Sequence, residues 1–392
     1  MADKKLSYTA EELNTFKSRI ETLEVDPASI YWYIRNRSTE KISGYLLRNN
    51  PSSITPRLNL INLGDMQGDN TILSRMIDWI DKEPALDGLF SSFALVGDII
   101  GDTQVSKAAY AAKCTAFWAQ AEDSPIPVFS CLGNHELNHD GTNNDYFCDK
   151  HDHRQYFIQP MLDLDETLVS DVANEDACYF YKDFVIHKTR VICLDQYDFP
   201  YTYDGEGNPD YSGSFADGNI GYSEAQLNWL VSALNVASDW NIVIICHEGI
   251  ATKETAVGET DDCLIDILSA YQNKTTVSTT ATSPLSFTIN GDFSGNSGKI
   301  IVIRGHTHFF KKETISGISE YTVINGDSAA VSSKYLKAGS SILSDAADIF
   351  SYDVTLDSFY FLRYGLVNKR YNEAGFDDDI NGFHYIDTPE TF

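Results

Sequence analysis

Five short apolar runs along the chain have the length and composition of buried strands. Between and after them, other segments place apolar residues three or four positions apart, which predicts helices with one face toward a core. The predicted strands cover residues 58–63, 93–96, 128–132, 242–246 and 299–304, and the predicted helices cover residues 70–80, 105–121, 223–234 and 262–271. Strands that alternate with helices in this way predict a layered α/β core.

The segments outside this alternation carry weaker patterns. Residues 179–194 predict a β-hairpin that turns near Lys182 and Asp183, and residues 350–364 predict further short strands. The Thr/Ser tract at residues 275–282 is expected to be a surface loop.

The segment between residues 139 and 176 is polar and rich in Asp and Asn, which predicts a loop. It contains His139, His151 and His153. We expect these histidines to face solvent rather than to contact a substrate.

The N-terminal part of the chain begins with a helix signal. Thr9 and Glu12 form a capping box, and residues 13–23 then carry one apolar stripe at helical spacing. The stripe is short for a coiled coil. It either packs on the core of its own chain or mediates self-association.

A polar group follows each of the five apolar strands at its carboxyl end. The groups are Gly64-Asp65-Met66-Gln67, Gly97-Asp98 with Asp102 four residues further, Gly133-Asn134-His135-Glu136, His247-Glu248, and Gly305-His306-Thr307-His308. Open α/β sheets bind ligands at the carboxyl ends of their strands. Carboxylate, amide and imidazole donors together suit divalent Mn, Fe or Zn. One such group alone is more often a simple turn, but five in succession are difficult to attribute to turn chemistry.

The order of these groups resembles the pattern of the calcineurin-like metallophosphoesterase superfamily, and residues near the C-terminus are similar to a bacterial and phage-type subgroup. That pattern is Asp-x-His, Gly-Asp-x-x-Asp, Gly-Asn-His-Glu/Asp, a lone His, and Gly-His-x-His. The resemblance implies an α/β fold, a four-layer α/β/β/α sandwich with two central mixed β-sheets. The implied segments are a helical extension over residues 1–56, a catalytic core over residues 57–312, and C-terminal strands with an acidic tail over residues 313–392.

The resemblance also implies a centre of two divalent metal ions, Mn, Fe or Zn. The first ion would take Asp65, Gln67, Asp98 and His308, and the second Asp98, Asn134, His247 and His306. Asp98 would bridge the two ions, because one carboxylate has two oxygens.

His135 is the catalytic residue that the resemblance implies, since it would stabilise the transition state or protonate the leaving oxygen. Asp102 or Glu136 would hold its tautomer. The chain departs from the family pattern in two places. Gln67 stands where most members have His, and Asp102 lies four residues after Asp98 where many members have three. The first departure bears on metal affinity and the second on which acid orients His135.

Composition and charge limit the classes of partner that the protein is expected to bind. Of 392 residues, 43% are hydrophobic and 22% are charged, as in globular proteins. The 57 Asp and Glu residues outnumber the 29 Lys and Arg residues, so the formal net charge is −28. A field of that sign disfavours nucleic-acid polymers and anionic membrane surfaces as partners.

Targeting signals and cysteines indicate a compartment. No run approaches the roughly 20 apolar residues of a membrane helix, and the first residues lack the apolar region of a secretory signal. Seven cysteines, an odd number without close spacing, suggest reduced thiols. We therefore expect a cytoplasmic protein, with association to a virus particle as the alternative.

Two functions from different classes remain open. The resemblance implies a phosphohydrolase that cleaves a phosphomonoester or phosphodiester by attack of a hydroxide bridging two metal ions. Its substrate would be small or flexible. The alternative is a catalytically weak or inactive protein of the same fold with a structural or binding role, for example in a phage particle. A nuclease ranks third because of the negative charge.

The net charge gives a first testable expectation. The protein should not retard duplex DNA in a gel-shift assay at physiological ionic strength, because binding of that kind depends on counterion release by a basic surface. A clear shift at that salt concentration would show that a local basic surface outweighs the overall field.

Overall fold

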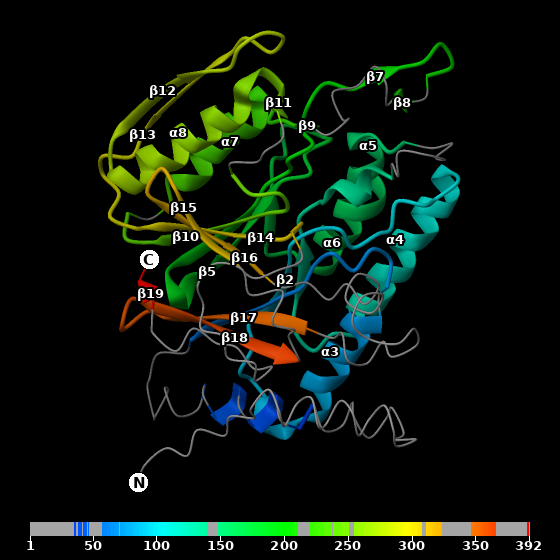
Figure 1. The fold of residues 1–392 in the computed structure, drawn as a ribbon, viewed down its shortest axis with the longest axis vertical. Helices are drawn as coiled ribbons and strands as arrows, with labels where there is room; N and C mark the ends of the chain where they lie inside the picture. Colours follow the sequence, from blue (N-terminus) through cyan, green and yellow to red (C-terminus); the bar gives the residue numbers. More distant parts are fainter. Residues whose placement is uncertain are drawn as a thin grey trace, which may run out of the picture.

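Two mixed β-sheets form the centre of the protein (Figure 1). The computed structural model describes residues 35–36, 38–40, 42–44, 46, 57–69, 71–138, 147–207, 209–210, 219–236, 238–250, 255–307, 311–323, 346–365 and 390–391. The predicted α/β class with two central mixed sheets is confirmed. Its description as a complete four-layer sandwich stays a prediction.

The six-stranded sheet holds the first three predicted strands side by side. β1 is parallel to β2, and β2 is parallel to β3, so their carboxyl ends share one edge. β17 lies antiparallel to β1 on its other side and adds C-terminal residues to the sheet. In spatial order the strands are β19 (Glu390–Thr391), β18 (Ser358–Gly365), β17 (Ala346–Asp353), β1 (Leu58–Asn62), β2 (Ser92–Leu95) and β3 (Val128–Ser130).

The seven-stranded sheet is built around the other two predicted strands. β10 is parallel to both β6 and β14, so these three strands also end at one edge. β16 is also parallel to β14, and antiparallel pairs complete the sheet, with β15 beside β16 on one side and β5 and β4 beyond β6 on the other. In spatial order the strands are β15 (Lys311–Ile315), β16 (Ile318–Thr322), β14 (Ile300–Arg304), β10 (Asn241–Cys246), β6 (Thr189–Cys193), β5 (Phe180–Phe184) and β4 (Leu168–Ser170).

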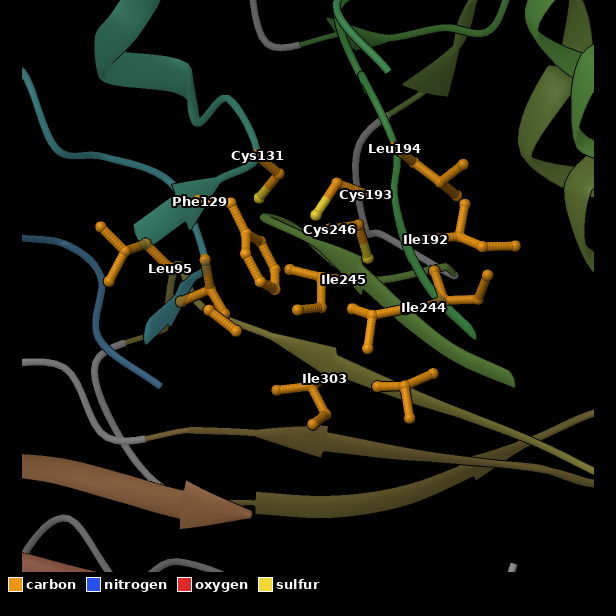
Figure 2. Close-up of a cluster of buried hydrophobic side chains, with 14 of the residues drawn as sticks. Leu95, Phe129, Cys131, Ile192, Cys193, Leu194, Ile244, Ile245, Cys246 and Ile303 are labelled. Carbon is orange, nitrogen blue, oxygen red and sulfur yellow. The ribbon is translucent and has the colours of Figure 1, made fainter. Parts of the chain in front are cut away.

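Aromatic contacts show that the two sheets pack face to face. The rings of Phe129 in β3 and Phe180 in β5 meet edge to face with centroids 6.2 Å apart. At the other side, the Tyr321 ring in β16 lies 5.0 Å from the Phe361 ring in β18. Figure 2 shows part of the buried core to which both sheets contribute, with Leu95 and Phe129 from one sheet and Ile245 and Ile303 from the other.

Helices cover the outer surfaces of the sheets. Trp79 in α3 packs on Tyr364 in β18, with ring centroids 4.6 Å apart. Because Tyr364 and Phe361 are three residues apart in a strand, they point to opposite faces, so α3 lies on the side away from the second sheet. α8 packs against β14 and β16 of the seven-stranded sheet. The α-helices are α3 (Thr71–Lys82), α4 (Lys107–Glu122), α5 (Lys150–Asp152), α6 (Gln159–Leu164), α7 (Glu224–Leu234) and α8 (Thr260–Asn273).

Short elements connect these parts. They are the 3₁₀ turns η1 (Pro84–Leu86), η2 (Asn134–Leu137), η4 (Val185–His187) and η5 (Val257–Glu259), the π-helical turn η3 (His153–Ile158), and the two-stranded pairs β7 (Thr202–Tyr203) with β8 (Pro209–Asp210), β9 (Asn219–Ile220) with β11 (Thr255–Ala256), and β12 (Thr276–Thr280) with β13 (Thr288–Asp292). Among the helices of the described residues, none has the length and hydropathy needed to cross a membrane. All seven cysteines are buried and carry no disulfide, as the reduced-thiol expectation requires.

The described residues between 35 and 46 are helical and pack on α3. Arg35 is buried and pairs with Asp78 at 2.7 Å, and Trp79 Nε1 donates to Thr39 Oγ1 at 2.8 Å. This part of the extension therefore belongs to the folded body of the chain. The capping box and the apolar stripe at residues 13–23 lie outside the described residues, and the division into three segments stays a prediction.

Two segments that we expected to be loops contain helices or strands among their described residues. Within residues 139–176 the chain forms α5, η3, α6 and β4. Phe157 packs on Phe117 and Trp118 of α4, so one apolar face stabilises helical structure despite the polar composition. The Thr/Ser tract forms β12, which pairs with β13 in a hairpin along α7 and α8 (Figure 1). The β-branched threonines fit that extended backbone.

The hairpin at residues 179–194 turns later than expected. β5 continues through Lys182 and Asp183 to Phe184, and the turn is η4. Lys182 is buried and donates to Asp165 Oδ2 at 2.6 Å, while Asp183 pairs with Arg190 of β6 at 2.7 Å. Both charged residues are thus held within the strand by ion pairs, which the turn prediction overlooked.

The contact between the sheets gives a stability prediction. Phe129→Ala should lower the free energy of unfolding by about 3–5 kcal/mol, because it removes a fully buried ring from the interface and leaves a cavity. Urea unfolding followed by circular dichroism measures the loss. Val172→Ala, at a side chain that is 98% exposed, is the control and should stay within about 0.5 kcal/mol of wild type. Equal effects of both substitutions would contradict face-to-face packing at Phe129.

Candidate metal centre

Side chains from both sheets meet where the parallel strands end. Asp65, Asp98 and Asn134 follow β1, β2 and β3 of the six-stranded sheet. His247 and His306 follow β10 and β14 of the seven-stranded sheet. The structure therefore brings together five of the residues selected from the sequence, which are as much as 241 residues apart along the chain.

The backbone at these strand ends turns sharply. Asp65, Asp98 and His306 all have a positive φ, of 48°, 54° and 71°, in the left-handed region that few non-glycine residues adopt. Hydrogen bonds between the turns maintain this conformation. Asp65 N–H donates to the Gly97 carbonyl at 3.0 Å, and His306 N–H donates to Asp65 Oδ1 at 3.1 Å. Strained residues held by their surroundings are frequent at functional sites.

Two glycines allow the turns to approach one another. A Cβ at Gly133 would lie 2.2 Å from Asp98 Oδ1. A Cβ at Gly97, whose φ is +88°, would lie 2.9 Å from His247 Nδ1. A side chain at either position would displace a residue of the centre, so both glycines are required by space, and Gly97 is also required by its left-handed backbone conformation.

Four donor atoms converge on one point of the centre. Asn134 Oδ1 lies 3.0 Å from His247 Nε2 and 3.1 Å from His306 Nδ1, and the two nitrogens lie 3.3 Å apart. Asp98 Oδ2 lies 3.1 Å from His247 Nε2. Atoms bound to one metal at about 2.0–2.2 Å are separated by about 3.0–3.5 Å, so these spacings match a shared coordination shell.

The tautomer of His247 supports a cation at this point. Its Nδ1 lies 2.7 Å from the Val96 carbonyl oxygen, which can only accept, so Nδ1 carries the hydrogen. Nε2 of the neutral ring then presents a lone pair toward the oxygens of Asp98 and Asn134. In addition, Asp98 Oδ2 is buried and accepts no hydrogen bond with suitable geometry from the residues that the structure describes. These residues fit a divalent metal ion, which would satisfy all four atoms at once.

Burial and charge act together on the acids and bases of the centre. Burial raises the pKa of Asp65 well above its ordinary value. Burial also acts to raise the pKa of Asp98, but the adjacent His247 and His135 hold it below its usual range. Burial lowers the pKa of His247, and the Asp98 carboxylate more than offsets this, raising it to about 10. In the metal-free protein a proton on His247 therefore balances the negative charge of Asp98, and a bound metal ion would replace that proton at Nε2.

The residues expected at the first ion are only partly described. Asp65 is fully buried, and its Oδ1 lies 3.9 Å from His247 Nε2. The Nε2 atom of Gln67 lies 3.2 Å from His135 Nε2. His308 lies outside the described residues. A metal role for Gln67 and His308 stays a prediction, and the structure adds that the Gln67 amide contacts His135.

His135 lies at the margin of the centre, with 20% of its side chain exposed. Its Nδ1 lies 2.9 Å from Asp102 Oδ2, and its Nε2 lies 3.6 Å from Asp98 Oδ2. The structure therefore places Asp102, rather than Glu136, on the ring of His135. Burial lowers the pKa of His135, but the hydrogen bond to Asp102 and the charge of Asp98 raise it to about 9.

Sequence reasoning missed two residues behind the centre. The carboxylate of Glu136 accepts hydrogen bonds from backbone N–H groups, including that of Asp98 at 2.9 Å. The expectation for His153 was wrong, because it is fully buried and its Nε2 lies 3.0 Å from the Glu136 carbonyl oxygen. His151 is exposed as expected, and His139 lies outside the described residues. The position of Glu136 three residues after Gly133, from which a Glu side chain can reach back to the N–H group before a helical turn, was a signal for the first role.

Comparisons with known proteins find similarity at the level of structure. No protein-family model and no curated protein sequence matches the chain. Three of the similar solved structures are described here. A dimetal phosphatase from Danio rerio has a TM-score of 0.49 and 14% identity, over 79% of this chain and 96% of that chain. GAP50, the anchor in the inner membrane complex of Plasmodium, has a TM-score of 0.40 and 12% identity, over 79% and 85%. The phosphopantetheinyl hydrolase of Mycobacterium tuberculosis has a TM-score of 0.35 and 10% identity, over 74% and 95%. At these levels the similarity carries no conclusion about activity.

The pair of His135 and Asp102 gives a prediction about pH. In the metal-free protein the imidazole should remain protonated up to about pH 9, and the stability that this charge adds should be lost as the pH rises from about 6.5 through 9. Asp102→Asn should lower the pKa of His135 toward 6.5, because it removes the acceptor charge. NMR titration of the ring checks both values. An unchanged pKa in Asp102→Asn would show that Asp102 does not act on His135.

Proposed function

We propose that this chain is an enzyme, a dinuclear metal-dependent phosphohydrolase that cleaves a phosphomonoester or phosphodiester. The observation that carries the proposal is the convergence of Asp98, Asn134, His247 and His306 on one point, with His135 and Asp102 beside it. The order of motifs along the sequence independently supports the same reaction.

The protein groups have separate tasks in this reaction. Bound divalent ions would lower the pKa of a shared water toward neutrality and offset negative charge in the transition state. Asp98 Oδ2 lies 3.1 Å from His247 Nε2, and Asp98 Oδ1 accepts from the His135 backbone N–H at 2.9 Å. Asn134, His247 and His306 fix one ligand shell with three neutral donors. Because these three donors carry no charge, they would not cancel the positive charge of the bound ions, and the site could accept an anionic phosphoester.

His135 is placed to act as the general acid. Asp102 holds Nδ1, which leaves Nε2 as the atom that transfers a proton to the leaving oxygen. In the metal-free protein the adjacent Asp102 and Asp98 raise the pKa of this ring to about 9. Its partial exposure gives a substrate access to it, whereas Asp98 and His247 lie buried behind it.

The substrate that we propose is small or flexible. The net charge of −28 disfavours a nucleic-acid polymer, and a small phosphoester is less affected by the distant surface field because salt screens it within about 8–10 Å. A local cationic centre reverses the potential at the point of binding.

Hydrolysis of p-nitrophenyl phosphate and bis(p-nitrophenyl) phosphate by metal-stripped protein supplied with Mn²⁺ tests the proposal. Asp98→Asn should lose essentially all turnover and most bound metal, since it weakens both ligand shells. His135→Ala should keep its metal but lose about 10²–10⁴-fold in kcat, the usual contribution of general acid catalysis.

Asp176→Asn serves as the control in this assay. Oδ1 of the exposed Asp176 side chain lies 3.2 Å from Nδ1 of His151, which is also exposed. Substitution of Asp176 should change neither metal content nor rate. Two metal equivalents in an active Asp98→Asn protein would contradict the assignment. Metal bound by the wild type with no turnover of either ester would favour the structural or binding alternative.

A further inference from the structure

Glu136 is a buried carboxylate that the proposed reaction does not use directly. It follows His135 and is fully buried. Its two oxygens accept hydrogen bonds from four backbone N–H groups rather than from a side chain: Asp98 at 2.9 Å and Gly133 at 2.6 Å to Oε2, and Ile99 and Ile100 at 2.7 Å each to Oε1. One side chain thus joins the turn that follows β2 to the turn that follows β3.

These four donors belong to the backbone that carries two ligands. Asp98 itself donates one of them, and Gly133 precedes Asn134 directly. The carbonyl groups of the same Asp98 turn are also engaged, since Gln67 N–H donates to the Asp98 carbonyl at 2.8 Å and Gly68 N–H to the Ile99 carbonyl at 3.0 Å. The peptide groups of the turn are therefore fixed on both sides.

The backbone of Asp98 needs such support. Its φ of 54° lies in the left-handed region, which costs on the order of 1 kcal/mol or more for a residue with a side chain. Hydrogen bonds to an ionised acceptor are about twice as strong as neutral ones. The two oxygens of Glu136, which accept from four backbone N–H groups, therefore stabilise a conformation that the turn would otherwise leave.

Glu136 is itself held from behind. Its main-chain carbonyl oxygen lies 3.0 Å from Nε2 of the buried His153, which begins the π-helical turn η3. That turn packs through Phe157 on α4. The acid is thus connected to the body of the protein rather than to a surface loop.

We propose that Glu136 is a positioning residue, which fixes the Asp98 and Asn134 ligands in the geometry that a divalent metal requires, with His153 as its support. This inference rests on the proposed metal centre and deepens it. The carboxylate acts by holding backbone atoms, so it touches neither metal nor substrate, and its loss should appear first as weakened metal binding.

Glu136→Gln is the direct test, because it keeps the size of the side chain. One amide oxygen can still accept from two N–H groups, but the NH₂ group then faces two further donors and can satisfy neither. The affinity for Mn²⁺, measured by calorimetry and by electron paramagnetic resonance on folded protein, should fall about 10- to 100-fold, as for other residues that orient metal ligands. Excess Mn²⁺ should restore much of the lost activity.

Asp348→Asn is the matched control for the loss of a buried carboxylate. Asp348 lies in β17 of the same sheet, is buried, and accepts from Arg363 Nη2 at 2.9 Å. Its substitution should lower the unfolding temperature but leave the Mn²⁺ affinity of the folded protein unchanged. This separates a loss of stability from a loss of positioning.

His153→Phe gives a second, independent variant that keeps the ring and removes the hydrogen bond to the Glu136 carbonyl. It should also weaken Mn²⁺ binding, but by a smaller factor than Glu136→Gln. If Glu136→Gln does not fold, this variant tests the positioning role instead. Wild-type Mn²⁺ affinity in folded Glu136→Gln, or in His153→Phe where that variant alone folds, would overturn the inference while leaving the proposed function intact. Absence of Mn²⁺ binding by the wild type would instead overturn the proposed function.

Discussion

The Asp98 carboxylate is a buried negative charge at the junction of two sheets, and the surrounding structure is organised around it. It lies at the end of β2 with only 1% of its surface exposed, and His247 from the opposite sheet lies 3.1 Å from its Oδ2. An ionised group without water needs compensating charge and hydrogen bonds. The imidazoles supply part of that compensation, and a divalent cation would supply the rest.

The same constraint explains why the nearby backbone is so closely packed. Turns from different strands must approach within hydrogen-bonding distance for their side chains to share one cation. Gly97 and Gly133 leave space for this close approach. Hydrogen bonds between the turns at Asp65, Asp98 and His306 keep the turns together. Face-to-face packing of the sheets, through contacts such as Phe129 on Phe180, sets the distance between the two groups of ligands.

Residues at increasing distance from this point have different roles. In the proposed centre Asn134 and His247 would contribute donor atoms, whereas His135 with Asp102 lies at the partly exposed margin, where the proposed reaction needs a proton donor. Glu136 acts on backbone N–H groups behind the ligands. The proposed reaction would need all three kinds of group, because metal affinity, proton transfer and rigidity are separate requirements.

The sequence by itself determined the strands that carry the centre and the residues at their ends. Apolar runs such as 128–132 and 242–246 are long enough to be recognised, and a polar group directly after each run is visible without any structure.

Local sequence signals were insufficient where long-range contacts determine the structure. Phe157 makes a helix of a polar segment by packing on α4, and His153 is buried by the same packing. The sequence also left open which acid contacts His135 and what Glu136 binds. The Glu136 carboxylate accepts from N–H groups that lie 36–38 residues earlier in the chain, and a local pattern does not predict such contacts. Only the tertiary structure shows which groups Asp102 and Glu136 contact, because distances between separate strands are set by how the two sheets pack, and no local pattern encodes that.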